Sequence, residues 1–375
     1  MTELRRGAAV GFHGHLAAIA VDGLDQESLR ALIDLAEGAA DSAVSLYLSI
    51  HRAEILGLAN GSRHLSWRIF ADTAGGGLLP TILAYALPEG ELPGQRVVKS
   101  GTIAPLDPKP DFTNEESLAV EAVMQLAIEA RLLPALLVVR RPHRPPQSPC
   151  WSSELYCLTD AALHNQTLAR EQPSPRVKLV SRAQIPLSHP QVPEPIPAEF
   201  LSFRPSNGGS DQIAVMIGEP NLQQPVTVRL HSSCLTGDLF GSLRCDCGEQ
   251  LHAAIRRLSQ SDGGVILYLP QEGRGIGISN KLRAYRLQEA GFDTLDANQQ
   301  LGFDPDLRDY GTAVAILQTI GISAVRLLSN NPTKHSLLEE LGMPVVERLN
   351  HSFPANPHNH SYLQTKKLRG RHDLD

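Results

Sequence analysis

The apolar residues of the first 140 positions follow two different periods. ALIDLAEGA (31–39) and SLAVEAVMQLAIEARLL (117–133) repeat apolar residues at the spacing of one helix face. AVSLYLSI (43–50) and ALLVVR (135–140) are short, continuous apolar runs, which are typical of buried strands. Helices and strands therefore alternate, and the pattern predicts an α/β domain over residues 1–145.

The pattern is lost after residue 140. RRPHRPPQSPCW (140–151) is dense in proline, which lacks a backbone N–H and interrupts helices and sheets. Further proline-rich stretches, REQPSPRV and LSHPQVPEPIPAEF, continue to residue 200. We expect residues 146–204 to be a Pro-rich connector with irregular elements.

A clear alternation returns from residue 205 to residue 375. Apolar runs predict strands at 211–218, 226–231, 263–270, 324–329 and 343–349, and helical spacing predicts helices at 249–259, 280–291, 310–321 and 330–342. Pro332 suits the first turn of the last of these helices, and Gly321 and Gly342 suit C-terminal caps. The sequence thus predicts an α/β (mixed α+β) fold of two domains, the C-terminal one (205–375) with a mixed sheet and a site at its strand ends.

Composition narrows the classes of function. The net charge of −6 gives no general attraction to nucleic acid or to an anionic membrane, and no uncharged apolar run is long enough to span a bilayer. The N-terminal residues MTELRRGAAVGFHGH are typical of a strand or helix start, not of a signal peptide. The chain has five cysteines, and they are not distributed like a framework of disulfides. Their odd number and clustering favour a reducing compartment. We therefore expect a cytoplasmic protein.

Three of the five cysteines lie within HSSCLTGDLFGSLRCDCGEQ (231–250). Thiolates are preferred ligands of zinc, and Cys234, Cys245 and Cys247 would fill three corners of its tetrahedron. The open fourth corner is the arrangement of a catalytic zinc, which activates water. Two alternatives stay open: three free thiols buried as small apolar residues, or a structural zinc with His231 as the fourth ligand. The His-x-Glu and Pro-Cys-x-x-Cys signature of zinc deaminases is absent.

Three further segments contain groups suited to phosphate. QEGRGIGISNK (271–281) lies between a predicted strand and a helix, where backbone amides and Arg274 favour an anion; a tight turn without a ligand is the alternative. DPDLRDYG (304–311) places carboxylates on both sides of Arg308, which also fits a solvated turn with an ion pair. NNPTK (330–334) is either a helix cap or a second phosphate contact.

Several of these blocks, in the same order, resemble GTP cyclohydrolase II, the first enzyme of riboflavin biosynthesis. The resemblance runs from about residue 205 to the C-terminus and includes RLHSSCLTGDLFGSLRCDCGEQL, the QEGRGIG and RDYG blocks, RLLSNNPTK and NHSYLQTKKLRG. It implies hydrolysis of GTP to 2,5-diamino-6-(5-phospho-ribosylamino)pyrimidin-4(3H)-one, formate and pyrophosphate. It also implies one Zn²⁺ per chain, Mg²⁺ on the triphosphate and a homodimer.

The resemblance assigns roles by position. Cys234, Cys245 and Cys247 match the zinc ligands, and a zinc-bound water would attack C8 of guanine beside Tyr285. Arg308 matches the arginine proposed to attack the α-phosphorus, with Asp306 as its base, because a protonated guanidinium is a poor nucleophile. The substrate-contact positions fall on Arg229, His231, Ser232, Ser233, Gln250, Glu272, Gly273, Arg274, Thr294, Ser329 and Lys334.

Two positions depart from the family pattern. Ser233 stands where the family usually has glutamate before the first zinc cysteine, which removes a carboxylate beside the metal. Ser329 replaces a usual threonine and keeps the hydroxyl. The first change leaves open a paralogue with partial ring opening or a role in another pathway. A non-catalytic GTP-binding regulator is a separate alternative, which loss of Arg308 or of a zinc cysteine would favour; both are retained.

Parts of residues 1–145 resemble 3,4-dihydroxy-2-butanone 4-phosphate synthase, which is fused to this cyclohydrolase in many bacteria. LPGQRVVKSGTIAPL and FTNEESLAVEAVMQLAIEARLLPALLVV show this resemblance. AVSLYLSIHRAEILGLANG stands where an acidic, magnesium-binding cluster is expected, and Thr-Asn-Glu at 113–115 replaces His-Thr-Glu. We expect a degenerate, inactive domain, with an unrelated α/β domain as the alternative.

Overall fold

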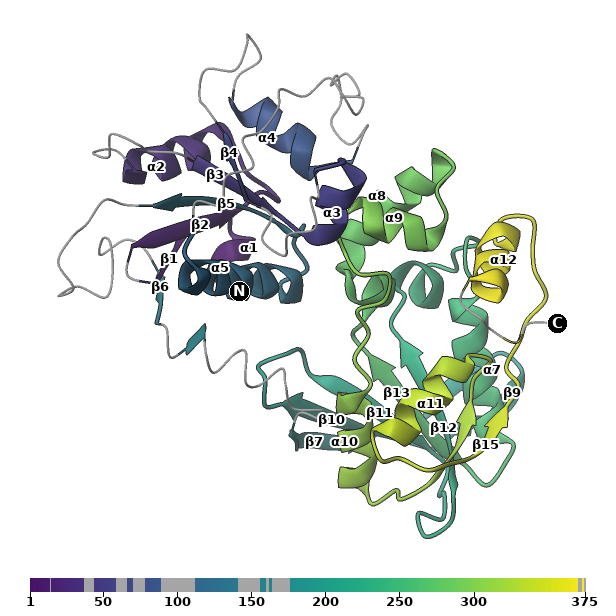
Figure 1. Ribbon diagram of the computed structural model, residues 1–375. Coiled ribbons are helices and arrows are strands. Elements are labelled where there is room, and N and C mark those ends of the chain that lie inside the picture. Colours follow the sequence, from purple (N-terminus) through teal and green to yellow (C-terminus); the bar gives the residue numbers. More distant parts are fainter. Residues whose placement is uncertain are drawn as a thin grey trace. The chain divides into compact units, whose positions relative to one another are not determined.

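The computed structural model in Figure 1 describes residues 1–13, 15–36, 44–58, 66–69, 78–88, 112–140, 156–159, 162–163, 176–369 and 373. Contacts divide the chain into two compact units. Unit 1 comprises Met1–Leu168 and Ser279–Leu307, and unit 2 comprises Ala169–Ile278 and Arg308–Asp375. The expected domain boundaries at residues 145 and 204 stay a prediction.

In the part of the chain that the structure describes, we find no helix that is both long and apolar enough to span a bilayer.

Unit 1 contains a six-stranded sheet in the order β4-β3-β5-β2-β1-β6. Its strands are β1 (Val10–Phe12), β2 (Leu16–Ala20), β3 (Val44–Leu48), β4 (Ser66–Ile69), β5 (Ala135–Arg140) and β6 (Tyr156–Leu158). Its helices are α1 (Thr2–Arg5), α2 (Gln26–Ala36), α3 (Ile50–Ile55), α4 (Leu78–Ala86), α5 (Asn114–Glu129), α9 (Thr294–Gln300) and, from Ser279 onward, α8 (Gly277–Glu289). The helices expected at 31–39 and 117–133 and the strands expected at 43–50 and 135–140 are confirmed where the structure describes them; residues 37–43 lie outside the described residues.

The sheet of unit 1 is buried on both faces, which explains its continuous apolar runs. Along β5, Leu137 and Val139 pack with residues of α2 and α4, whereas Leu136 and Val138 pack against α5. Adjacent strand residues point to opposite faces, so one strand contributes to two cores.

Thr113 and Glu116 form a capping box at the start of α5. The Glu116 backbone N–H donates to Thr113 Oγ1 at 3.2 Å, and the Thr113 backbone N–H donates to Glu116 Oε2 at 2.7 Å. His15 Nε2 and Arg140 also bind the Glu116 carboxylate, at 2.5 and 2.8 Å. Thr113, the first residue of the Thr-Asn-Glu stretch, is therefore the N-cap of a helix, which gives this segment a structural use.

Cys157, in β6, is disulfide-bonded. We had expected a compartment in which thiols stay reduced, so this disulfide was not predicted.

Residues 279–307 are tied to unit 1 by hydrogen bonds to buried groups. Arg52 is 4% exposed and donates to the carbonyl oxygens of Tyr85, Leu87 and Gln300 at 2.8, 2.6 and 3.0 Å. Ser49 Oγ donates to the carbonyl oxygen of Gly302 at 2.6 Å. We had expected this segment to belong with the residues from 205 onward, and its contacts group it with the N-terminal half.

Unit 2 contains a seven-stranded sheet in the order β15-β14-β12-β13-β11-β10-β7 and a two-stranded sheet of β8 and β9. The strands are β7 (Val177–Gln184), β8 (Leu187–His189), β9 (Val192–Ile196), β10 (Ala198–Pro205), β11 (Gln212–Ile217), β12 (Val226–Ser232), β13 (Gly264–Leu269), β14 (Val325–Leu328) and β15 (Val345–Leu349). The helices are α7 (Cys247–Ser259), α10 (Gly311–Ile320), α11 (Pro332–Glu340) and α12 (His360–Leu368), with the short helical turns η1 (Leu235–Leu239) and η2 (Glu272–Gly275). The mixed sheet and the elements expected from 205 to 349 are confirmed.

Helices cover both faces of the large sheet (Figure 1). Val265 and Leu267 of β13 pack on the side of α10 and α11, and Ile266 packs on the side of α7. Strands β13, β12, β14 and β15 are parallel, so their carboxyl ends lie at one edge of the sheet. Polar groups that follow these strands are thereby brought together.

Regular strands occupy part of the segment 146–204, where we expected irregular elements. β7 pairs with β10 at the edge of the sheet, and most residues of β7 are exposed, so it lacks an alternating apolar pattern. Pro193 and Pro195 of β9 are exposed in a sheet of only two strands, where a missing N–H is tolerated. Sequence patterns fail here because few side chains are buried.

Arg52→Met is expected to lower the free energy of unfolding by about 3 kcal/mol, because it leaves buried carbonyl groups without their donor. Arg30→Met, at an exposed position of α2, is the matched control and should change stability by less than about 0.5 kcal/mol. Urea unfolding followed by circular dichroism measures both. Equal midpoints for the two variants would show that Arg52 does not hold the segment in place.

Candidate active site

Three loops meet at the carboxyl ends of parallel strands. Ser233 and Cys234 follow β12, residues 270–277 follow β13, and Ser329 and the residues up to Lys334 follow β14. The Ser233 N–H donates to the Leu269 carbonyl oxygen at 2.8 Å, which links the first two loops. These segments lie at the strand ends, where we expected a site; the site itself stays a prediction.

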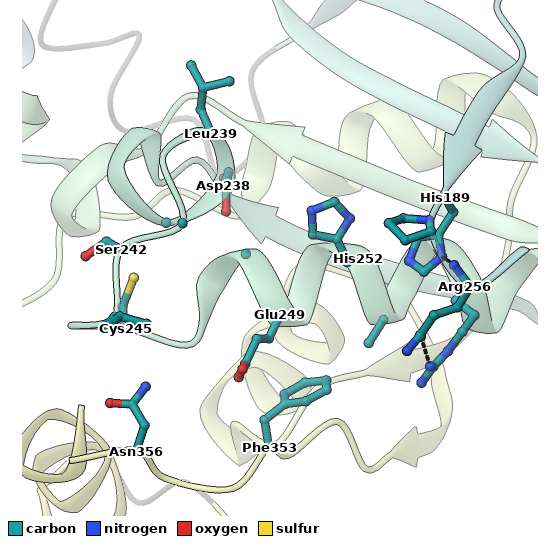
Figure 2. A pocket seen from close by; sticks show the side chains of 17 residues that line it. His189, Asp238, Leu239, Ser242, Cys245, Glu249, His252, Arg256, Phe353 and Asn356 are labelled. Atoms are coloured by element: carbon teal, nitrogen blue, oxygen red, sulfur yellow. Dashed lines mark hydrogen bonds between the residues drawn. The ribbon is translucent and has the colours of Figure 1, made fainter. Parts of the chain in front are cut away.

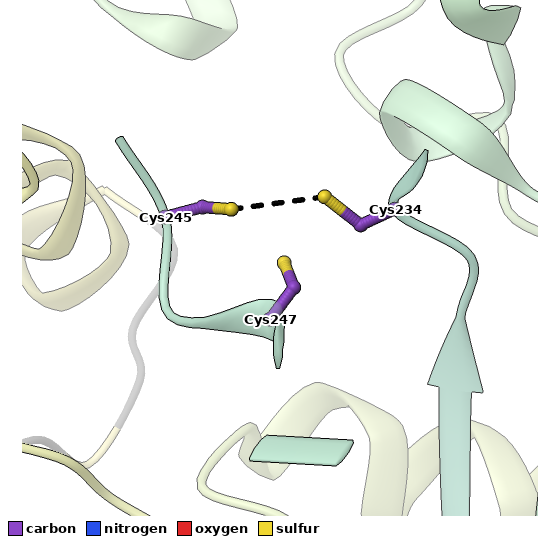
Figure 3. Close-up of side chains that lie close together, drawn as sticks. All are labelled: Cys234, Cys245 and Cys247. Carbon is purple, nitrogen blue, oxygen red and sulfur yellow. Dashed lines mark hydrogen bonds between the residues drawn. The ribbon is translucent and has the colours of Figure 1, made fainter. Parts of the chain in front are cut away.

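Cys234, Cys245 and Cys247 direct their thiols toward one another (Figure 3). The Sγ atoms of Cys234 and Cys245 are 3.7 Å apart, and all three ligand atoms lie within 4.8 Å of one another. A tetrahedral zinc with Zn–S bonds of about 2.3 Å requires sulfur atoms about 3.8 Å apart. The triad therefore fits zinc, and among the described residues it is the single cluster of His, Cys, Asp and Glu that could hold a metal.

Two glycines make this convergence possible. A Cβ atom on Gly237 would lie 2.8 Å from Cys245 Sγ and 3.1 Å from Cys234 Sγ. A Cβ on Gly248 would lie 2.4 Å from the Gly237 carbonyl oxygen. The turn η1 and the start of α7 can approach each other only without these side chains, and the space so created is the space between the thiols.

The close approach of the thiols raises the pKa values of two of them. Hydrogen bonding with Cys234 is the main cause that raises the pKa of Cys245 to about 11, and burial adds to it. Hydrogen bonding with Cys234 and Cys245, together with burial, raises the pKa of the Cys247 thiol well above its usual value. A bound divalent cation would supply positive charge that stabilises three adjacent thiolates, and the thiols would release their protons on binding it.

Asp238 fixes the position of Cys234. Its carboxylate accepts hydrogen bonds from the Cys234 N–H at 2.9 Å and from the Tyr268 hydroxyl at 3.0 Å. The Asp238 N–H in turn donates to the Cys234 carbonyl oxygen at 2.7 Å. The first cysteine is thus held at both its backbone groups by one residue.

His231 lies outside the group of thiols that could hold a metal. Its Nε2 atom lies 3.1 Å from each carboxylate oxygen of Asp238. Burial lowers the pKa of His231, so the ring is neutral and its Nε2–H donates to Asp238. The buried Nδ1 is then an acceptor, and it has no hydrogen-bond partner among the described residues.

Asp246, between the second and third cysteines, is 1% exposed and joins two parts of the site. Its Oδ1 accepts from Lys366 Nζ at 2.7 Å, and its Oδ2 accepts from Gln250 Nε2 at 2.6 Å. Gln250 Oε1 accepts from a terminal nitrogen of Arg229, whose other terminal nitrogen donates to the Leu328 carbonyl oxygen. Burial lowers the pKa of Arg229, and nearby acidic groups oppose that shift.

The loop after β13 has an unusual backbone. Arg274 has φ +62°, between Gly273 at +63° and Gly275 at +99°, and a left-handed conformation is strained for a residue with a side chain. The Glu272 carboxylate accepts from the Leu235 N–H at 2.6 Å, so this loop is fastened to the residue after Cys234. The predicted arrangement of strand, loop and helix is confirmed.

Arg308 and Lys334 approach the ring of Tyr310, with charged groups 5.8 and 5.6 Å from its centroid. Lys334 Nζ also donates to the Leu230 carbonyl oxygen at 3.2 Å, and Ser329 Oγ accepts from the Asn331 N–H at 3.1 Å. Asn331 caps α11 as expected for NNPTK. Two cations thus lie beside one ring at the ends of the parallel strands.

Tyr285, Thr294 and Asp306 belong to unit 1. Lys281 Nζ lies 5.6 Å from the ring centroid of Tyr285, Thr294 Oγ1 accepts from Gln288 Nε2 at 3.4 Å, and Asp306 is exposed. The other predicted site residues lie in unit 2.

An open pocket of about 570 Å³ borders the triad (Figure 2). It runs along α7 from Ser242 and Cys245 to His189 and Arg256. Gly237 and Gly248 also line it, so the wall of the pocket includes the turn that encloses the thiols.

Sequence reasoning assigned no role to Asp238, Asp246 or Lys366. The two aspartates lie inside the cysteine segment, and their unusual position beside ligands was the available signal. Lys366 is separated from Asp246 by 120 residues, and nothing in its local sequence indicates that contact.

Comparisons with known proteins agree with the geometry of unit 2. A family model described as GTP cyclohydrolase II matches residues 190–350. The chain is 38% identical over 390 aligned positions to a protein of Azospirillum brasilense named GTP cyclohydrolase-2, which covers 98% of the chain and 91% of that relative. It is 43% identical over 256 residues to a GTP cyclohydrolase-2 of Xylella fastidiosa (strain 9a5c), covering 68% of the chain and 61% of the relative.

Other similarities are partial. A riboflavin biosynthesis protein RibBA of Parabacteroides distasonis is 50% identical over 184 residues, which cover 48% of the chain and 45% of the relative. The crystal structure of RibBX, a two-domain 3,4-dihydroxy-2-butanone 4-phosphate synthase from A. baumannii, is 16% identical with a TM-score of 0.30, covering 88% of the chain and 91% of that structure. A TM-score this low does not establish a shared fold.

Gly237→Ala is expected to abolish stoichiometric metal binding, because the added methyl group would occupy the space between the thiols. Gly241→Ala is the matched control in the same loop: its φ is +64°, but its Cβ would meet no atom within 4 Å. It should cost about 1 kcal/mol of stability and leave the metal in place. Metal analysis after dialysis distinguishes them, and full metal content in Gly237→Ala would contradict the arrangement of the thiols.

His351 is expected to make stability fall in mild acid. Burial, followed by the charge of Arg229, lowers its pKa from 6.5 to about 3, and its Nε2 donates to the Gln250 carbonyl oxygen at 2.8 Å. Between these values the unfolded chain binds a proton that the folded chain excludes. The free energy of unfolding should therefore fall as pH decreases from 6.5 toward 3, by up to about 1.4 kcal/mol per pH unit.

Urea unfolding at several pH values measures this dependence. His351→Gln should reduce the slope below pH 6.5, whereas His358→Gln, at an exposed position, should leave it unchanged. Identical slopes in the wild type and both variants would show that His351 is not buried in its neutral form.

Proposed function

The chain belongs to the GTP cyclohydrolase II family, and we propose that it hydrolyses GTP in a zinc-dependent reaction. The products would be 2,5-diamino-6-(5-phospho-ribosylamino)pyrimidin-4(3H)-one, formate and pyrophosphate, in the first step of riboflavin biosynthesis. The thiol triad is the observation that carries the proposal. Two of its sulfur atoms are 3.7 Å apart, a separation that fits zinc, and three thiolate ligands would leave a fourth tetrahedral position open.

Cys234, Cys245 and Cys247 would hold the zinc. When bound, the metal supplies the Lewis acidity that activates water for hydrolysis of the imidazole ring of guanine. Asp238 and Gly237 keep the first cysteine and the central space in place. His231 Nδ1, a buried acceptor, is suited to a hydrogen-bond donor of the substrate.

The cations of unit 2 would bind the triphosphate, together with Mg²⁺. Arg308 and Lys334 lie beside Tyr310. Arg274 lies in the glycine-rich loop that follows β13, at the same edge of the sheet. Guanidinium and ammonium groups are the usual protein partners of phosphate oxygens. Gln250, Arg229, Ser232, Glu272 and Ser329 already have protein partners, so binding of GTP would exchange or extend these contacts.

The release of pyrophosphate would proceed through Arg308. Its guanidine nitrogen would form a bond to the α-phosphorus as the bond to the β-phosphate oxygen breaks, and Asp306 would accept the proton. Water would later cleave the phosphorus–nitrogen bond. The complete reaction consumes three waters: one for this release and two for the loss of C8 as formate. The roles of Asp306, Tyr285 and Thr294 rest on the family motif.

Further parts of the proposal come from family resemblance. We propose a homodimer in the cytoplasm, with no role in binding nucleic acid or membranes. We also propose that residues 1–145 are a degenerate dihydroxybutanone phosphate synthase domain. The use of Thr113 and Glu116 as a capping box supports a structural role for the stretch that replaces His-Thr-Glu.

The test is an anaerobic assay of the purified, zinc-loaded protein with GTP and Mg²⁺, which follows formate, pyrophosphate and the pyrimidine together. We expect equal amounts of the three products. Cys247→Ser should reduce formate by at least about 100-fold, because loss of a ligand exceeds the 10–100-fold cost typical of residues that support one. Ser242→Ala, on the neighbouring loop, is the control that should retain activity.

The product pattern distinguishes the alternatives. Pyrophosphate without formate would mean that ring opening is lost, and would point to Ser233 in place of the usual glutamate. No product from folded, zinc-loaded protein would contradict the proposal and leave a GTP-binding regulator.

A further inference from the structure

The C-terminal helix α12 reaches the metal site through one buried ion pair. Lys366 is 9% exposed, and its Nζ lies 2.7 Å from Oδ1 of Asp246, whose residue is 1% exposed. Asp246 is the residue between Cys245 and Cys247, and it immediately precedes the first residue of α7. Any displacement of this carboxylate is therefore transmitted along the backbone to two of the three thiols.

Charge explains why the pair is needed. The Asp246 carboxylate is buried, and the Lys366 ammonium, 2.7 Å away, is the cation in direct contact with it. With three thiolates and one Zn²⁺, the cluster has a net charge of about −1, and an unpaired carboxylate between two ligands would add a second buried negative charge. The Lys366 ammonium neutralises it.

The Lys366–Asp246 ion pair is connected by hydrogen bonds to other polar residues of the site. Asp246 Oδ2 accepts from Gln250, and Gln250 accepts from Arg229. Lys366 also lies 4.5 Å from the ring centroid of Tyr362, one turn earlier on α12. The helix is anchored by Leu363, which is 7% exposed, and by the fully buried Asn359 before it.

We propose that Lys366 is a positioning residue: through Asp246 it sets the geometry and charge of the Cys245–Cys247 ligand pair. This inference rests on the proposed function only in that the triad holds a divalent metal. It predicts that the tail of the chain controls metal affinity although it contributes no ligand.

The experiment replaces zinc by Co²⁺, whose visible bands and thiolate charge-transfer absorption report the ligand geometry without any assay of activity. Lys366→Met should lower Co²⁺ affinity by about 10–100-fold and shift these bands. Lys367→Met is the matched control, since it is the next residue on α12 and exposed, and it should match the wild type. The double variant D246N/K366M removes both charges and should recover much of the lost affinity.

The outcomes separate this inference from the proposed function. Wild-type affinity and spectra in Lys366→Met, with circular dichroism showing a folded protein, would overturn the role of Lys366 and leave the cyclohydrolase proposal intact. A double variant as impaired as Lys366→Met would overturn the charge argument, because packing of the lysine alone would then explain the loss. A wild type that binds Co²⁺ through thiolates but forms no product would refute the cyclohydrolase proposal and leave the positioning role standing. No cobalt–thiolate absorption in the wild type would overturn both.

Discussion

The site depends on the mutual approach of three thiols that, without a cation, gain little from being together. Hydrogen bonding among them and burial raise the pKa values of Cys245 and Cys247, so adjacent thiolates are unfavourable here without a cation. The fold holds the thiols together by omitting side chains at Gly237 and Gly248 and by fixing the backbone of Cys234 with Asp238. A metal ion would therefore bind to thiols that are already in position.

The parallel part of the unit 2 sheet determines what surrounds the thiols. Because β12, β13 and β14 end at the same edge, the cysteine segment, the glycine-rich loop with Arg274 and the loop with Lys334 follow neighbouring strands. Hydrogen bonds between these loops, such as that from the Leu235 N–H to Glu272, make them one structure. The thiol triad and the cationic side chains that we propose to bind phosphate thus lie along one sheet edge.

Much of this arrangement is predictable from sequence where the pattern has a direct physical cause. The apolar runs of β5, β12 and β13 indicate strands buried on both faces, and the spacing of Cys234, Cys245 and Cys247 indicates a metal. The exposed edge strand β7 and the Lys366–Asp246 pair were not predictable, because the former buries few side chains and the latter joins residues 120 positions apart. The grouping of residues 279–307 with unit 1 depends on buried donors such as Arg52, which no periodicity reveals.

X-ray absorption at the zinc edge of the purified protein examines the metal directly. Three sulfur neighbours at about 2.3 Å and one oxygen neighbour would establish an open, water-accessible site made by the three cysteines. A shell closed by a nitrogen atom of His231 or by a fourth sulfur would contradict it, since no position would remain for the water that ring hydrolysis requires. Absence of zinc from protein purified without chelator and reloaded with the metal would contradict the site itself.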